Sequence, residues 1–381
     1  MNIVALNESV AGERRCALTP LVVEKLLRLG AGVSVESGLG VRAGHGDEEY
    51  VKAGAKVELE REHLLREADL LLTVRPPGVP LTASLRESAV VAGFLDPFFN
   101  PELVGALVSR GLSSLCMELI PRTTYAQKMD ALSSQASLAG YAAVLLAAER
   151  SAKAFPMMST PAGTIPPARA FVIGAGVAGL QAIATAKRLG ARVEAYDTRP
   201  VVKEQVQSLG AKFVEIDVGE TGQTEQGYAK ELTAEQLESQ RRQMAKICAN
   251  SDVIVSTAQV FGRRAPRIID ESMVAGMRRG SVIVDMAAAT GGNVAGSKPG
   301  EEVLTENGVL IIGADDLPAR VAKDASHVYA NNLYLLIEHA WDKEASALRL
   351  DPQDAVVGAC LLTVGGEIRD ERVKAALGVN R

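Results

Sequence analysis

Three closely spaced glycines give the clearest indication of a ligand site in this sequence. Residues 171–180 read Phe-Val-Ile-Gly-Ala-Gly-Val-Ala-Gly-Leu, so Gly174, Gly176 and Gly179 follow the spacing Gly-x-Gly-x-x-Gly. Between a strand and a helix, such glycines allow a tight turn, room for a pyrophosphate group and close packing of the helix on the strand. A helix that begins near Val177 also directs unpaired N–H groups at the phosphates. The pattern therefore predicts a dinucleotide-binding turn.

The residues around this turn have the pattern that such a site requires. A β-branched run at 170–173 precedes the glycines, and a helical pattern that ends at Gly190 follows them. A second strand pattern, at 193–196, leads to Asp197. With strand, helix and acid all present, a glycine-rich turn without a ligand is the less favoured interpretation.

Asp197 is expected to accept hydrogen bonds from the hydroxyl groups of an adenosine ribose. Its negative charge would repel a 2′-phosphate, which favours NAD over NADP. Thr198 and Arg199 follow it directly, and an arginine beside this carboxylate is what accommodates a 2′-phosphate in other proteins. We expect NAD(H) as the cofactor because the acid occupies the end of the strand.

A second polar segment, residues 121–141, lies between two apolar stretches. Its side chains Arg122, Gln127, Asp130 and Ser133 can converge on a ligand's amide and the neighbouring groups. Alternatively, the segment is an interdomain loop whose Asp and Ser cap helices. The residue types alone leave both interpretations open.

The composition is that of a soluble globular protein with more than one domain. Of 381 residues, 47% are apolar and 23% are charged, and the charge sum of 41 − 46 = −5 disfavours nucleic-acid binding. The four cysteines form no Cys-x-x-Cys pair and the four histidines are scattered, so neither disulfides nor a metal site is expected. The N-terminus has no signal-peptide pattern, and no apolar run approaches the roughly 18–20 residues of a membrane span. We expect a cytoplasmic protein with reduced thiols.

Two series of alternating strand and helix patterns predict two α/β domains with parallel sheets. Strands are expected at 2–6, 33–36, 70–74 and 90–95, and then at 170–173, 193–196, 212–216, 253–256, 281–285 and 309–312. A strand-like segment at 356–364 lies in a tail that either forms a third element or packs back on the first domain. Helices are expected at 20–29, 138–154 and 331–341. The proline-rich stretch 155–167 is typical of a loop or linker, and 217–250 of a long polar loop followed by a solvated helix.

Several segments together are similar to one family. They are the polar run 122–141, the glycine-rich stretch 174–190 and the strings at 154–169, 227–231 and 285–293. They closely resemble the NAD(H)-binding component of proton-translocating nicotinamide nucleotide transhydrogenase. The resemblance covers essentially the whole chain, and the run 122–141 is its most specific part.

The resemblance implies an α/β fold in which two Rossmann-like domains flank a nucleotide-binding cleft. Residues 1–130 with 325–381 would form the N-terminal domain, and residues 131–324 the NAD(H)-binding domain. The component is a homodimer in that family, and its C-terminal segment returns to the first domain.

The same resemblance assigns roles to the polar residues. The family's Arg-Gln-Asp loop contacts the nicotinamide and ribose, matching Arg122, Gln127 and Asp130, and a serine at the carboxamide matches Ser133. A mobile loop closes over the nucleotide with its tyrosine, matching Gly227 and Tyr228 in the polar loop expected above.

The implied reaction is direct hydride transfer from NADH to NADP+ held by a partner subunit. Proton translocation through a membrane-spanning partner is coupled to it, so the chain would be cytoplasmic and peripheral at the inner face of the membrane. Hydride transfer of this kind needs orientation and exclusion of water rather than acid–base groups. That agrees with the lack of a conspicuous catalytic His, Cys or Lys in the sequence.

Alanine dehydrogenase is the nearest alternative, which the chain resembles through residues 15–20 and the same domain plan. That family's catalytic Lys matches Arg75, its His matches Phe94 and one of its acids matches Ala289. Arginine does not release its proton near neutral pH, so Arg75 is a poor acid–base group. Arg15 is then interpreted as part of a surface ion pair. A nucleotide-binding regulator without chemistry is disfavoured because it does not need the polar run.

Overall fold

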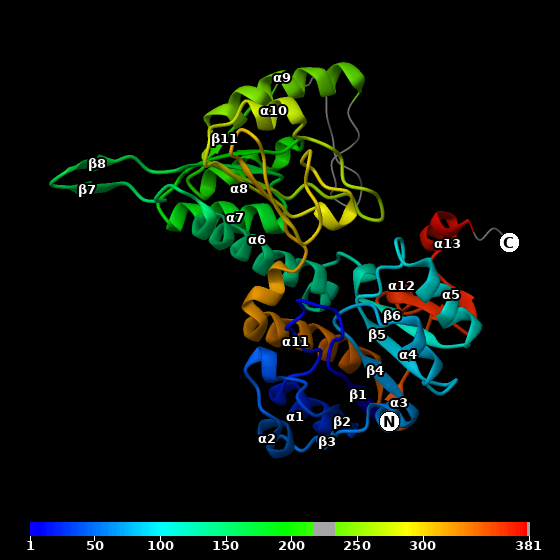
Figure 1. Cartoon of the computed structure of the whole chain (residues 1–381). Coiled ribbons are helices and arrows are strands. Elements are labelled where there is room, and N and C mark those ends of the chain that lie inside the picture. Colours follow the sequence, from blue (N-terminus) through cyan, green and yellow to red (C-terminus); the bar gives the residue numbers. More distant parts are fainter. Residues whose placement is uncertain (217–232, 379–381) are drawn as a thin grey trace. The chain divides into compact units, whose positions relative to one another are not determined.

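The chain forms two compact units in a computed structural model that describes residues 1–216 and 233–378 (Figure 1). The first unit consists of Met1–Gln135 and Pro318–Arg381, and the second of Ala136–Leu317. The boundaries expected from the sequence, after residues 130 and 324, lie a few residues from this division.

The first unit contains an eight-stranded sheet. Six of its strands are parallel and follow the order β3-β2-β1-β4-β5-β6. This order is the one found in dinucleotide-binding folds. Two antiparallel strands from the C-terminal part of the chain, β18 and β19, extend the sheet beyond β6. The strands β1 to β6 are Asn2–Ala5, Gly32–Glu36, Lys56–Glu58, Leu70–Leu72, Val90–Gly93 and Ser113–Cys116, and β18 and β19 are Leu361–Val364 and Glu367–Ile368.

Helices connect and cover these strands. Helix α1 begins with Pro20, whose missing N–H suits a first turn, and it buries Val22, Val23 and Leu26 against the sheet. The helices are α1 (Pro20–Arg28), α2 (Asp47–Lys52), α3 (Arg61–Glu67), α4 (Val79–Ala83), α5 (Pro101–Ser109), α11 (Ala322–Ala340), α12 (Val357–Cys360) and α13 (Glu371–Leu377). Shorter elements are the 3₁₀ turns Val41–Ala43, Met117–Leu119, Ala126–Met129 and Leu317–Val321 and the strand pair β16 (Trp341–Asp342) and β17 (Ala347–Leu348).

Helix α11 belongs to the first unit because its buried face closes that unit's core. The hydroxyl of Tyr329 donates to the carbonyl of Thr73 at 2.7 Å and accepts from the backbone N–H of Phe94 at 3.2 Å. One fully buried side chain therefore joins the ends of β4 and β5 to a helix more than 200 residues away in sequence.

The second unit has six parallel strands in the same order, β11-β10-β9-β12-β13-β15, with the antiparallel strand β14 at the edge. They are β9 (Arg169–Ile173), β10 (Arg192–Tyr196), β11 (Lys212–Phe213), β12 (Val253–Ser256), β13 (Val282–Asp285), β14 (Glu302–Leu304) and β15 (Leu310–Gly313). The helices of this unit are α6 (Ala131–Arg150), which begins in the first unit, α7 (Val177–Arg188), α8 (Lys203–Ser208), α9 (Ala234–Asn250) and α10 (Glu271–Ala275), with 3₁₀ turns at Pro200–Val202 and Ala288–Thr290.

Side chains of this second sheet alternate between two apolar clusters, one on each face. In β9, Ala170 and Val172 join the cluster formed with α6, α7 and α8, whereas Phe171 and Ile173 join the cluster formed with α9 and α10. Helices cover both faces of this sheet (Figure 1). The central strands β9, β12 and β13 are therefore mostly apolar. The fold prediction of an α/β chain with two Rossmann-like domains is confirmed.

Helix α6 corrects two expectations from the sequence. It starts at Ala131 rather than at residue 138, so the second half of the polar run, from residue 131, lies in its first turns. Among the described residues it is also long and apolar enough to cross a membrane by length and composition, with a mean hydropathy of 1.4. The sequence interpretation missed this because serines and Gln135 interrupt the apolar run. Half of the apolar window is buried inside the protein.

Three further segments differ from the expectation. The stretch 155–167 holds a hairpin of β7 (Met158–Thr160) and β8 (Gly163–Ile165), which projects as an arm from the second unit (Figure 1). The segment 356–364 begins as helix α12 and becomes a strand only at Leu361. Helix α11 begins nine residues before the expected position at 331, because its first turns are already packed on the core.

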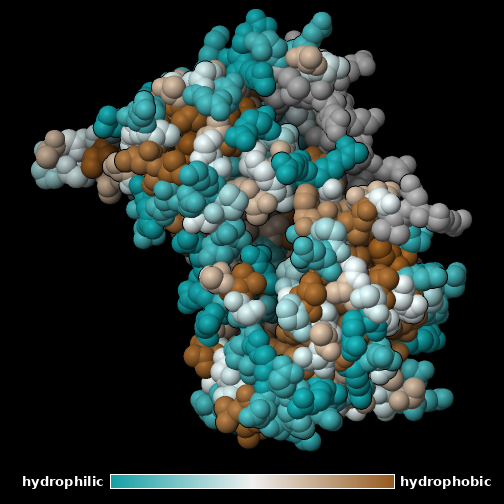
Figure 2. All heavy atoms as spheres, turned by 45° about the vertical axis from the view of Figure 1, so that its right-hand side comes forward, coloured by the Kyte–Doolittle hydropathy of each residue, from teal (hydrophilic) through white to brown (hydrophobic). Residues whose placement is uncertain are grey.

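The hairpin arm is exposed on all sides. Its six strand residues are all exposed, and Met157, Met158 and Ile165 expose 64%, 40% and 38% of their surfaces. Hydrophobic side chains are visible along the arm in Figure 2. A two-stranded hairpin without a packing partner is marginally stable in water, so this arm is a candidate contact surface.

Replacing Gly179 is expected to destabilise the second unit. A Cβ at this position would lie 1.9 Å from the carbonyl oxygen of Gly174, which is backbone and cannot rotate away. Gly179→Ala should therefore lower the free energy of unfolding by about 1–3 kcal/mol or more. Thermal and denaturant unfolding would measure the change.

Gly105→Ala is the matched control, because a Cβ there would meet nothing within 4 Å in the middle of α5. It should raise stability by about 0.5–1 kcal/mol through helix propensity. A Gly179→Ala protein as stable as the unmodified chain would contradict the packing described.

Candidate functional site

The glycine-rich turn joins β9 to α7 at the carboxyl end of the second sheet. Gly174 has a φ of +91°, in the left-handed region that favours glycine. Gly179 allows the backbone of α7 to contact the turn, because any Cβ at this position would collide with the Gly174 carbonyl oxygen. A Cβ at Gly176 would find its nearest neighbour, Arg199 Nη2, only at 4.0 Å, so space remains in front of this residue. The tight turn and the close helix–strand packing predicted from the spacing are present, and the contact with a pyrophosphate stays a prediction.

The first turn of α7 is accessible and carries no side-chain cap. Its N-cap is Gly176, which has no side chain to accept hydrogen bonds, and Val177 exposes 45% of its surface. First-turn N–H groups and the helix dipole attract negative groups such as phosphate. This geometry fits the pyrophosphate of a dinucleotide.

Asp197 lies at the end of β10 and faces the turn. Its Oδ2 accepts from the N–H of Ala175 at 2.7 Å, and its Oδ1 accepts from the N–H of Arg199 at 2.8 Å. The Arg199 side chain adds two bonds, from Nε to Oδ1 at 2.9 Å and from Nη2 to Oδ2 at 2.8 Å. The carboxylate that was expected to bind the ribose is therefore already held by four donors, with Thr198 partly exposed between the two charged residues.

Thr257, which the sequence interpretation missed, supports the turn from the neighbouring strand. Its hydroxyl lies 3.1 Å from the carbonyl oxygen of Ile173 and 3.2 Å from that of Gly174, and it donates to this pair. It follows β12, which is next to β9 where the strand order reverses, the usual ligand position in such sheets. Only the strand order reveals this neighbour, because Thr257 is more than 80 residues from the turn in sequence.

The polar run brings three of its four predicted residues to one cavity of about 400 Å³ within the first unit. Gln127, Asp130 and Ser133 line it, while Arg122 is exposed outside it. Residues of α11 that the sequence interpretation missed complete the lining: His327, Val328, Asn331 and Asn332. No local pattern connects α11 with this run.

Asp130 acts as a helix cap at the start of α6. Its Oδ1 accepts from the N–H of Ser133 at 2.9 Å, and its Oδ2 accepts from the Ser133 hydroxyl at 2.6 Å. Asn332 holds the same segment from α11, donating to the carbonyl of Lys128 at 2.8 Å and accepting from the Ser134 hydroxyl at 2.7 Å. The capping alternative therefore describes Asp130 and Ser133, and only Gln127 of the three is well exposed to a ligand.

The remaining predicted contacts, Gly227 and Tyr228, lie outside the described residues. Within residues 1–216 and 233–378, no three His, Cys, Asp or Glu side chains are grouped to hold a metal ion. The four cysteines are free and buried.

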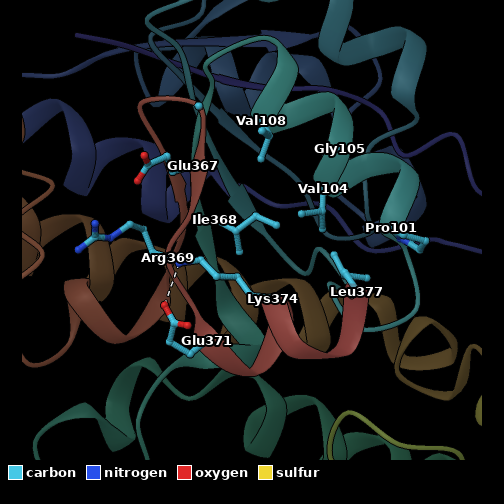
Figure 3. A pocket seen from close by; sticks show the side chains of 11 residues that line it. Pro101, Val104, Gly105, Val108, Glu367, Ile368, Arg369, Glu371, Lys374 and Leu377 are labelled. Carbon is cyan, nitrogen blue, oxygen red and sulfur yellow. Dashed lines mark hydrogen bonds and ion pairs between the residues drawn. The ribbon is translucent and has the colours of Figure 1, made fainter. Parts of the chain in front are cut away.

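A larger cavity of about 860 Å³ lies in the first unit between α5 and α13 (Figure 3). Val104, Ile368 and Leu377 supply apolar lining, and Lys374 donates to Glu371 at 2.8 Å on its rim. None of the predicted contact residues lines it, so its size does not make it the nucleotide site.

Comparison with known proteins identifies the family. The family models described as alanine dehydrogenase/PNT, N-terminal domain and C-terminal domain match residues 4–139 and 143–371. The chain belongs to the alanine dehydrogenase/PNT family. It is 43% identical over 372 residues to the first part of the NAD(P) transhydrogenase alpha subunit of Rickettsia prowazekii, covering 97% of this chain and 96% of that protein. A relative of the same name from Rhodospirillum rubrum is 43% identical over 375 residues, covering 97% of each.

Both branches of the family share this fold. A solved transhydrogenase structure from Sinorhizobium meliloti has a TM-score of 0.84 and 40% identity, covering 98% of this chain and all of that one. An L-alanine dehydrogenase structure has a TM-score of 0.82 at 21% identity, covering 100% and 99%. Alanine dehydrogenase of Mycobacterium tuberculosis is 27% identical over 389 residues, covering 100% and 97%. The resemblance drawn from the sequence is confirmed.

The residue that links the chain to alanine dehydrogenases, Arg15, is not at the surface as expected. Its side chain is 5% exposed and its partner Glu13 only 1%. Nε and Nη2 of Arg15 donate to the Glu13 carboxylate at 2.8 and 2.6 Å, and Nη1 donates to Gln135 Oε1 at 2.8 Å. The surface interpretation was wrong because β-strand ends and the start of α6 enclose this pair, which the local sequence does not show.

The residues matched to other alanine dehydrogenase positions also have partners within the protein. Arg75 Nε lies 3.6 Å from Glu13 Oε2. The Phe94 ring packs on Tyr329 with 5.1 Å between ring centroids. Asp285 accepts from the backbone N–H groups of Ala287, Asn293 and Val294 and so holds a loop after β13.

Asp130 is expected to stabilise α6 through its cap. Asp130→Ala should lower the free energy of unfolding by about 1 kcal/mol, whereas Asp130→Asn keeps an acceptor for Ser133 and should cost only a few tenths. Denaturant unfolding of both variants would measure this. Equal stability of the Ala variant and the unmodified chain would show that the cap contributes nothing.

Glu8 is expected to make the first unit less stable as pH rises. It accepts from the N–H groups of Val74 and Arg75, and burial, with the nearby charge of Glu13, raises its pKa from 4.5 to about 7. Between these values the folded chain keeps a proton that the unfolded chain loses, so stability falls as pH rises from about 4.5 to 7.

Glu8→Gln should remove this dependence and reduce the loss of unfolding free energy between about pH 5 and 8 by roughly 1–3 kcal/mol. Glu87→Gln, on an exposed carboxylate, is the control. The measurement is the free energy of unfolding as a function of pH over this range. If it changes equally with pH in the Glu8→Gln variant and in the unmodified chain, the raised pKa of Glu8 is ruled out.

Proposed function

We propose that this chain is the NAD(H)-binding subunit of a proton-translocating NAD(P) transhydrogenase. In this reaction a hydride passes directly from NADH to NADP+ bound on a partner subunit. The observation that carries the proposal is the turn of Gly174, Gly176 and Gly179 facing Asp197, in a chain similar over its whole length to transhydrogenase alpha subunits.

The residues of the second unit fit a dinucleotide. The open space at Gly176 and the uncapped start of α7 at Val177 suit the pyrophosphate. Backbone N–H groups orient Asp197, which is proposed to bind the adenosine ribose, with Thr198 and Arg199 beside it. Because Asp197 ends the strand, NAD(H) is the proposed cofactor.

The nicotinamide end is proposed to meet the polar run of the first unit. A bound dihydronicotinamide supplies the hydride, so the chain needs to orient that ring and exclude water. Gln127 presents an exposed amide beside Asp130 and Ser133, whose mutual hydrogen bonds keep them in place. Arg122 is exposed on the same run, and Gly227 and Tyr228 are proposed to cover the nucleotide.

The positions compared with alanine dehydrogenase disfavour that activity. An amino-acid oxidoreductase needs a group that accepts a proton and a free cation for the substrate carboxylate. Arg75 does not release its proton near neutral pH. All three side-chain nitrogens of Arg15 already donate to Glu13 or Gln135. Phe94 offers no proton-transfer group.

We also propose a homodimer that docks on NADP(H)-binding and membrane-spanning subunits at the cytoplasmic face of a membrane. The exposed β7–β8 arm, with Met157, Met158 and Ile165 in water, supports a protein partner for the second unit. The relatives are named as the first portion of a subunit alpha, which supports the presence of further subunits.

Hydride transfer to a partner is the first measurement. NADH oxidation by an NADP+ analogue should appear only when an NADP(H)-binding partner domain is added, because this chain supplies one nucleotide site of the two. Absence of transfer with a competent partner, together with NAD reduction on adding L-alanine, would overturn the proposal in favour of alanine dehydrogenase.

Variants of the polar run give the orienting test in the same assay. Arg122→Ala and Gln127→Asn should slow transfer by more than about tenfold and change the NADH dissociation constant by less than about threefold. Thr124→Ala, an exposed neighbour, is the control. Variants that weaken binding without slowing saturated transfer would show that these residues do not orient the ring.

A further inference from the structure

The Asp197 carboxylate divides its four hydrogen bonds equally between backbone and side chain. The N–H groups of Ala175 and Arg199 provide one bond to each oxygen, and they belong to the turn and to the chain after β10. Nε and Nη2 of Arg199 provide the second bond to each oxygen. A carboxylate has about four acceptor positions, so none remains for another donor.

The two backbone bonds orient the carboxylate whatever the Arg199 side chain does. The two side-chain bonds can be exchanged for those of a ligand, because the long side chain that makes them is 18% exposed. Behind it, the Asp197 side chain is only 6% exposed. The guanidinium thus covers the carboxylate on its solvent side.

The position of the guanidinium is also the position of the expected ligand. The open space in the turn lies in front of Gly176. The nearest atom to a Cβ built on Gly176 is Nη2 of Arg199, at 4.0 Å. A ribose diol that donates two hydrogen bonds to Asp197 needs the two acceptor positions that the arginine fork holds. The ligand and the fork therefore cannot bind the carboxylate together.

We propose that Arg199 is a displaceable latch on Asp197 that lowers the selectivity of this site for NADH over NADPH. The inference rests on the proposed nucleotide site and adds its selectivity determinant. A 2′-hydroxyl must displace the guanidinium and gains nothing from its charge. A 2′-phosphate cannot pair with Asp197 but gains the displaced guanidinium, which suits a phosphate through its planar fork.

Dissociation constants of NADH and NADPH for the full chain test this latch by calorimetry. Arg199→Ala should bind NADH more tightly and NADPH more weakly, shifting the ratio of the two constants by about tenfold. Arg199→Lys, which keeps the charge but cannot form the fork, should tighten NADH while retaining NADPH binding. Asp197→Asn should weaken NADH binding, since it removes the charged acceptor.

Arg192→Ala is the control for lost charge, because Arg192 is exposed at the start of the same strand. A ratio unchanged within about twofold in Arg199→Ala, or weaker NADH binding by that variant, overturns the latch. If the unmodified chain binds neither nucleotide, the proposed function fails and the latch with it. NADH binding by the unmodified chain with an unchanged ratio refutes the latch alone.

Discussion

The close contact between helix α7 and the end of strand β9 is the constraint on which the candidate site depends. Gly179 places the helix backbone against the Gly174 carbonyl, where a single methyl group would not fit. Thr257 holds the same carbonyl from the next strand. With the turn drawn in, the N–H of Ala175 reaches Asp197 at the end of β10. A looser helix would separate the start of α7 from the acid that follows the neighbouring strand.

Two ion pairs of this chain, Glu13–Arg15 and Asp197–Arg199, differ in how far they are exposed to water. A buried carboxylate without a partner is costly, so each acid described here is held by donors from the chain itself. Glu13 and Arg15 are enclosed almost completely, which makes their pair part of the first unit's core. The Arg199 guanidinium keeps contact with water, so its bonds to Asp197 can be exchanged for those of a ligand. Both arginines are paired, and the difference between them is that Arg199 is more exposed to water than Arg15.

The scaffold of this chain is shared by proteins that carry different names. This chain has two sheets whose parallel strands follow the same order. The solved transhydrogenase and L-alanine dehydrogenase structures are similar to it in fold. In the first unit, Arg15 and Arg75 both approach the Glu13 carboxylate, and the Phe94 ring packs on Tyr329. Arg75 and Phe94, at the positions matched to the acid–base groups of alanine dehydrogenase, offer no proton acceptor near neutral pH. The hydride transfer proposed for this chain would not require a proton acceptor.

Local patterns in the sequence determined the α/β class, most strands and the glycine turn with its acid. These features depend on neighbours within about twenty residues: strand alternation, the Gly174–Gly179 spacing and the acid at 197. The hairpin within 155–167 was missed because prolines flank short strands that pair only with each other. The helical start of α6 was missed because Asp130 and Ser133 are equally typical of ligand contacts and of helix caps.

Tertiary structure decided which polar groups are already satisfied. Asn332 and His327 reach the polar run from a helix about 200 residues away, and Gln135 reaches Arg15 across 120 residues. Asp197 and Arg199 are only two residues apart, but their pairing also depends on the fold. The N–H of Ala175 orients the Asp197 carboxylate, and both side chains are largely removed from water. Sequence spacing specifies which groups are present. Their pairing follows from the free energy of removing charge from water, which depends on what the whole chain encloses.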